Sequence, residues 1–92
     1  MATTVTTNTT ITFGEINAGQ VAFIDARGTW DGATATVKTQ SNGTYTAYAT
    51  DSSQTADFAR YYQLGDEDGI AVQFSGVGAN TSVTVAAIGY KP

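Results

Sequence analysis

The sequence predicts an all-β fold, a small antiparallel β-sandwich or jelly-roll-like barrel of about seven or eight short strands. Three observations predict it. Apolar and polar residues alternate with a period of two along most of the chain, β-branched and aromatic residues dominate these runs, and turn signals recur every eight to twelve residues. The length of 92 residues indicates a single domain that spans residues 1–92.

The first expected strand covers residues 4–13 and lies in the Thr-rich opening "TTVTTNTTITF". Val5, Ile11 and Phe13 share one face of this strand, and the other face is wholly polar. Residues 1–13 are therefore interpreted as an edge strand of the sandwich or as an inter-subunit arm that lies across another subunit's sheet. A disordered polar tail is the third interpretation.

The remaining strands are separated by clear turn signals. Asn42-Gly43 predicts a two-residue hairpin, and residues 28–32 and 65–69 are expected to be loops with Gly at both ends. A short turn is expected at 52–57. The further strands are expected at about 20–27, 32–40, 43–50, 57–64, 70–76 and 82–90, with an eighth strand if the first one breaks.

Several classes of function lack the residues that they need. The chain has no His and no Cys, so the usual general base, the thiol nucleophile and the Cys/His zinc site are absent, and we predict no catalytic or cofactor-binding residues. The net charge is −4, and the basic residues do not cluster, so neither a nucleic acid nor a membrane is an expected partner. The opening residues also lack the pattern of a signal peptide.

The acidic loop is the candidate metal site. Asp66, Glu67 and Asp68 lie between Gly65 and Gly69, and three carboxylates on one loop are the kind of oxygen ligands that calcium prefers. The spacing does not match the twelve-residue calcium-binding loop. The alternative interpretation is a solvated turn, in which Asp and Gly satisfy the turn geometry.

Aromatic residues and one arginine are the candidates for contacts with other molecules. Trp30 is interpreted as a lid over the core, as a subunit contact or as a sugar-stacking platform. Tyr61 and Tyr62 are adjacent in a strand, so one of them faces away from the core. Arg60 has the parity of the inward residues, so it is expected to point inward or toward a subunit axis. A buried Arg needs a carboxylate, and the two interpretations are a salt bridge within the chain, with Asp25 or Asp57 as the natural partner, or a salt bridge between subunits. The full set of interface candidates is Val5, Ile11, Phe13, Trp30, Tyr48, Arg60 and Tyr61.

Two segments carry a resemblance to a known family. The stretch "GTWDGATATVKTQSNGTYTAY" at 28–48 has a G-x-W-x-G-A-T strand followed by Q-S-x-G and an aromatic residue. The stretch "VQFSGVGANTSV" at 72–83 has the form of a closing strand pair. Together they resemble very small structural proteins of tailed bacteriophages, over about two-thirds of the chain, whereas the Thr-rich opening and "GDEDG" depart from the pattern.

The resemblance implies a non-enzymatic virion protein, because members of that family are capsid decoration (cement) proteins, head fibres or tail components. We expect a capsid decoration protein that forms a homotrimer, bridges subunits of the major capsid protein and resides in the virion after assembly in the host cytoplasm. One alternative is a tail or head-fibre component. The other is a small carbohydrate-binding module that uses Trp30 and exposed Tyr residues.

Overall fold

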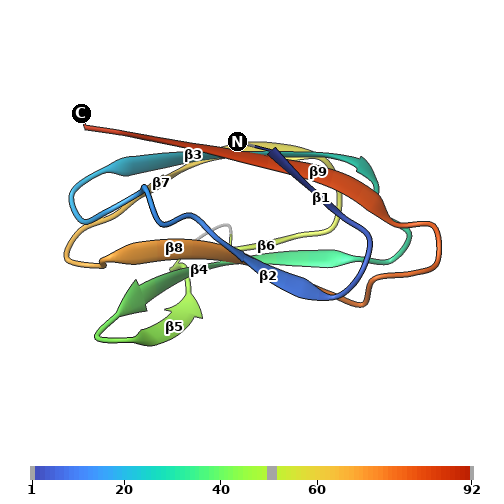
Figure 1. Ribbon diagram of the computed structural model, residues 1–92, viewed down its shortest axis with the longest axis horizontal. Helices are drawn as coiled ribbons and strands as arrows, with labels where there is room; N and C mark the ends of the chain where they lie inside the picture. Colours follow the sequence, from blue (N-terminus) through green and yellow to red (C-terminus); the bar gives the residue numbers. More distant parts are fainter. Residues whose placement is uncertain (1, 50–51, 92) are drawn as a thin grey trace.

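Two antiparallel sheets pack face to face in the computed structural model, which describes residues 2–49 and 52–91 (Figure 1). The all-β prediction is confirmed, because the described residues form nine strands and no helix. The strands are β1 (Ala2–Val5), β2 (Thr9–Thr12), β3 (Val21–Thr29), β4 (Thr34–Ser41), β5 (Thr44–Ala47), β6 (Ser53–Gln54), β7 (Phe58–Gln63), β8 (Gly69–Ser75) and β9 (Ser82–Tyr90).

The order of the strands is that of a jelly roll. The first sheet has the order β1-β9-β3-β7, and the second has the order β2-β8-β4-β5, with the two-residue strand β6 paired to β4. The pairs are nested: β1 pairs with β9, β2 with β8, β3 with β7 and β4 with β5. The chain is thus a long hairpin that is bent at β4–β5 and rolled into two sheets, which is the jelly-roll form of the β-sandwich.

The Thr-rich opening supplies an edge strand to each sheet. β1 pairs with β9 in the first sheet, and β2 pairs with β8 in the second, so the expected strand at 4–13 breaks where the chain crosses between the layers (Figure 1). At the crossing, the side-chain Oδ1 of Asn8 accepts a hydrogen bond from the backbone N–H of Val77 at 3.0 Å. The edge-strand interpretation therefore describes both halves of the opening within one chain.

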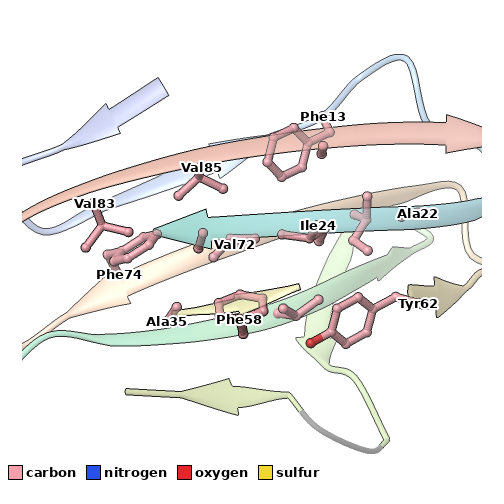
Figure 2. Close-up of a cluster of buried hydrophobic side chains, with 14 of the residues drawn as sticks. Phe13, Ala22, Ile24, Ala35, Phe58, Tyr62, Val72, Phe74, Val83 and Val85 are labelled. Atoms are coloured by element: carbon pink, nitrogen blue, oxygen red, sulfur yellow. The ribbon is translucent and has the colours of Figure 1, made fainter. Parts of the chain in front are cut away.

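The core lies between the two sheets and is built from the inward-facing residues of every long strand (Figure 2). From β3, Ala22, Ile24 and Ala26 are fully buried, as the period of two requires. Within each sheet a small buried residue pairs with a large one, Ala26 with Phe58 in the first sheet and Ala35 with Phe74 in the second. The side chains drawn in this cluster include Phe13, Ala22, Ile24, Ala35, Phe58, Tyr62, Val72, Phe74, Val83 and Val85.

The turns confirm one prediction and correct two. Asn42 (φ 53°) and Gly43 (φ 81°) both have positive φ, as a type I′ hairpin turn requires. The loop expected at 28–32 is wrong at its start, because β3 continues through Gly28 and Thr29 alongside β9. The turn expected at 52–57 contains β6, whose residues pair with Ala35 and Thr36 of β4.

Candidate interaction surface

The described part of the chain offers no enclosed site for chemistry. Residues 2–49 and 52–91 form no pocket that would hold a ligand, and they contain no group of three or more acidic side chains placed to hold a metal ion. None of their segments is a helix long and apolar enough to cross a membrane. A candidate functional site is therefore sought on the outer faces of the two sheets.

The outer face of the first sheet carries the exposed large hydrophobic side chains of the described residues. Tyr61 is 65% exposed, Ile88 63% and Tyr90 44%. Phe23 on β3 pairs with Tyr61 on β7 and with Ile88 on β9, so these three side chains form a row across three neighbouring strands. Val21 pairs with Tyr90 one step along. We call Val21, Phe23, Tyr61, Ile88 and Tyr90 the aromatic surface.

The rings of the aromatic surface support one another. The ring centroids of Phe23 and Tyr61 are 4.8 Å apart with the planes tilted by 48°. Those of Tyr61 and Tyr90 are 6.4 Å apart in an edge-to-face arrangement at 89°. Both geometries are favourable for aromatic pairs, so the rings are held in place before any partner arrives. Aromatic residues without neighbouring charges in the centre are also the composition of the core of a protein interface.

The strands that carry this surface are apolar on both faces near one end. β3 places Ala22 and Ile24 inward, and Val21 and Phe23 on the other side. β9 likewise places Ala87 inward, while Ile88 and Tyr90 point outward. A strand with apolar residues of both parities is typical of burial on both faces. Of this surface, only Tyr61 was predicted from the sequence as an interface candidate.

An ion pair lies on β3 beyond one end of the aromatic surface, and two acidic loops follow the strands at the other end. On β3, Arg27 Nε donates to Asp25 Oδ1 at 2.9 Å, and this hydrogen bond and the carboxylate charge raise the pKa of Arg27. At the other end lie the loops 14–20 and 64–68, which are joined by hydrogen bonds from Gly19 N to Gly65 O and from Leu64 N to Gln20 O. These loops lie at one end of the sandwich (Figure 1). Their charged residues are all acidic: Glu15, Asp66, Glu67 and Asp68.

The candidate calcium site is not supported by the geometry. Asp66, Glu67 and Asp68 do not form a metal-binding group. Glu67 Oε1 instead accepts a hydrogen bond from the backbone N–H of Gly65 at 2.7 Å, and the N–H of Asp68 donates to the carbonyl of Gln40 at 2.9 Å. The solvated-turn interpretation fits this arrangement, because the loop uses its own side chains to satisfy its backbone.

Trp30 belongs to the core. Its side chain is 9% exposed, its ring stacks on Phe74 with centroids 5.8 Å apart, and its Nε1 donates to Asp57 Oδ1 at 2.8 Å. That hydrogen bond, together with a second one from the N–H of Gly28, lowers the pKa of Asp57. The core-lid interpretation is therefore confirmed. The interpretation as a sugar-stacking platform is wrong, since neither face of the ring is open to a ligand.

The other interface candidates divide into buried and exposed groups. Val5 and Phe13 are buried in the core of the same chain, so they are not exposed contact residues. Ile11 and Tyr48 are partly buried and pack against that core. Tyr48 also donates its hydroxyl to the carbonyl of Gln63 at 2.8 Å. Of the seven candidates, only Tyr61 and Arg60 are exposed.

Arg60 does not form the predicted buried salt bridge. It has the inward parity, but its side chain is exposed because β7 is an edge strand of the first sheet. The two carboxylates proposed as partners are occupied elsewhere: Asp25 by Arg27, and Asp57 by Trp30 and Gly28. The prediction for the adjacent tyrosines is confirmed, with Tyr61 exposed and Tyr62 buried.

No protein-family model, curated protein sequence or solved structure matches the chain. Fold alone does not determine function, and the aromatic surface is the feature of this molecule that bears on it.

Proposed function

We propose that the protein is a non-enzymatic structural component of a bacteriophage particle, a capsid decoration or cement protein that forms a homotrimer and binds the major capsid protein. The observation that carries this proposal is the aromatic surface, an exposed apolar region on a chain whose described residues form no ligand pocket. A protein that acts by assembly needs a contact surface of this kind and does not need a cleft.

Two further features support the proposal. Jelly rolls recur in viral capsid proteins and in lectins, which is support by analogy of fold only. The resemblance to phage structural proteins falls on residues that build this fold: Trp30 fills the core, Gly43 makes the hairpin turn, and Gly28 lies where β3 meets β9. The resemblance therefore supports a shared architecture, and the aromatic surface supports a role in assembly.

The carbohydrate-binding alternative has lost its main residue, because the ring of Trp30 is buried. A tail or head-fibre component would need the same kind of contact surface. The experiment below distinguishes a protein that binds the tail from one that binds the capsid.

The test combines solution mass with binding to particles. Light scattering of the purified protein is expected to give three times the mass of the 9.5 kDa chain. Capsids that lack the protein are expected to bind it saturably in a sedimentation assay, and isolated tails are expected not to. A monomer that binds no particle would refute the proposal, and binding to tails alone would establish the tail alternative.

A further inference from the structure

We propose that Arg60 prevents the free edge of β7 from pairing with β7 of a second copy of the chain, so that the first sheet does not continue from one molecule into the next. The inference goes beyond the proposed function and does not depend on it. It gives a role to an exposed side chain that belongs neither to the core nor to the aromatic surface.

β7 is the longest edge strand in the described part of the chain. It has six residues and ends the first sheet, where it pairs with β3 on one side. The other edge strands are shorter: β1, β2 and β5 have four residues each, and β6 has two. An edge strand presents a row of unpaired backbone groups to which another chain can add a strand. β7 is therefore the edge of this fold that most needs protection.

Every second residue of β7 directs its backbone groups away from the sheet. The N–H of Leu64 donates to the carbonyl of Gln20 at 2.9 Å, in line with the ladder to β3. The carbonyl of Gln63 instead accepts a hydrogen bond from the hydroxyl of Tyr48 at 2.8 Å. Because the backbone groups of an antiparallel strand point to the partner at alternate residues, the residues that face the free edge are those with the parity of Gln63: Ala59, Tyr61 and Gln63. Tyr48 occupies the last of these carbonyls, so the accessible edge is centred on the two residues that flank Arg60.

The side chain of Arg60 lies on the inner side of this edge. It shares the parity of Phe58 and Tyr62, which are buried in the core, yet it is exposed. A strand added along β7 would place its own inward side chains beside the guanidinium and cover it. Covering a charge that has no opposite charge beside it is costly, and an inward-pointing charge is one of the ways in which natural edge strands resist strand addition.

A second copy of β7 has no carboxylate to offer. Its inward positions are Phe58, Arg60 and Tyr62, so whichever of them lies opposite Arg60, the added strand brings an aromatic ring or a second positive charge. Because no register of self-pairing compensates Arg60, this one residue opposes all of them.

The sequence of β7 shows why such protection is needed. Arg60 is the only charged residue in the segment "FARYYQL" at 58–64, which otherwise has three aromatic residues and neither Gly nor Pro. Segments of six or seven residues with high strand propensity and low charge are those that associate as intermolecular strands. Without Arg60, the longest free edge of the fold would carry an uncharged segment of this kind.

The first test measures solution mass by light scattering over a range of concentrations. Arg60→Thr keeps high strand propensity and removes the charge from an exposed position, so the variant is expected to fold. We expect its mass to rise with concentration to at least about twice that of the wild type, since edge pairing joins two copies of whatever species the wild type forms. Arg60→Lys and Arg60→Glu keep a charge at this position and should retain the mass of the wild type. Arg27→Thr is the matched control, because it makes the same change in net charge on β3, which is not an edge strand.

The second test locates the new contact by hydrogen exchange of the backbone amides. In the wild type, the amides of Ala59 and Tyr61 should exchange fast, whereas that of Tyr62, which faces β3, should exchange slowly. In the associated Arg60→Thr variant, the amides of Ala59 and Tyr61 should become protected, and those on the free edges of β1 and β2 should not change.

Several outcomes would overturn the proposal. Arg60→Thr at the mass of the wild type would show that the edge needs no protection, and equal association of Arg60→Glu or Arg27→Thr would show that a charge at this position is not what prevents it. New protection at β1 or β2 in place of β7 would put the contact at another edge, and loss of protection throughout the chain would mean that the variant unfolds instead of pairing. Protection of Ala59 and Tyr61 in the wild type would show that the edge is already covered. Capsid binding is decided separately by the experiment on particles, so failure of either proposal leaves the other standing.

Discussion

The carboxylate of Asp57 fixes two other residues of the chain from the loop before β7. It accepts hydrogen bonds from Trp30 Nε1 at 2.8 Å and from the backbone N–H of Gly28 at 3.0 Å. Both bonds favour the ionised form, with the Trp30 bond as the larger cause, and they lower the pKa of Asp57 from its ordinary value of 3.8. Protonation of this one surface carboxylate would therefore weaken the hydrogen bond that holds Trp30 over the core.

This coupling predicts a loss of stability in acid. Because the folded-state pKa of Asp57 is lowered, its contribution is complete above about pH 3.8 and is lost as the pH falls through the lowered value. Asp57→Asn keeps an oxygen acceptor but cannot titrate. We expect the urea concentration at the midpoint of unfolding to fall more for the wild type than for Asp57→Asn between about pH 6 and about pH 2. Parallel losses in the two proteins would contradict this account.

Predictions for single residues were correct where the alternation of side chains along one strand was enough to determine which way the residue points. The opposite orientations of Tyr61 and Tyr62 follow from strand geometry alone. Arg60 failed because parity indicates a face of the sheet but not the distance to the edge, and β7 is an edge strand. The exposure of Ile88 was missed because it depends on which strands lie beside β9, namely β1 and β3, and the sequence does not order them.

At the scale of the strands, β3 extends two residues further than the glycine pattern predicted. Gly28 lies opposite Val83 of β9 with φ at 148°, and a Cβ added there would overlap the carbonyl oxygen of Ser82. Glycine at this position marks a close approach of two backbones inside a sheet, not the start of a loop. The nested crossing of the opening segment was equally hidden, because Val5 and Ile11 share one parity in an unbroken strand.

Gly28→Ala is therefore expected to separate β3 from β9 locally and to lower the free energy of unfolding by about 3 kcal/mol. Urea denaturation at neutral pH measures the change. Gly14→Ala is the matched control, since an added Cβ there meets nothing within 4 Å and φ is not in the left-handed region. A Gly28→Ala variant as stable as Gly14→Ala would show that the close approach does not exist.

At the scale of the whole molecule, the fold is dominated by pairing between segments far apart in the sequence. The first strand pairs with the last, and the second with the next to last. The sandwich class could be predicted because alternation and turn spacing are local signals. The nested order could not, because it depends on which edges meet after collapse, and several orders satisfy the same alternation.

The nested order predicts slow folding without a proline phase. The entropy cost of closing long loops comes before the stabilising contacts between distant strands can form. Refolding is therefore expected in milliseconds to seconds. The only proline is Pro92 at the end of the sequence, so a phase of tens of seconds from proline isomerisation should be absent. Stopped-flow refolding followed by Trp30 fluorescence measures both features. Folding in microseconds, or a slow phase accelerated by a prolyl isomerase, would be inconsistent with them.

The pairing of β1 with β9 also determines how the domain responds to mechanical tension. Ala2 lies opposite Ala86, and β9 runs on to Tyr90, so both ends of the described chain leave the sheet in the same direction. A pull between them would peel β1 from β9 one hydrogen bond after another, which needs little force. A pull between opposite ends of the sandwich would instead shear whole strands at once. A partner that keeps this domain under tension would therefore unfold it less readily if it binds the face of the first sheet than if it pulls on the ends of the chain.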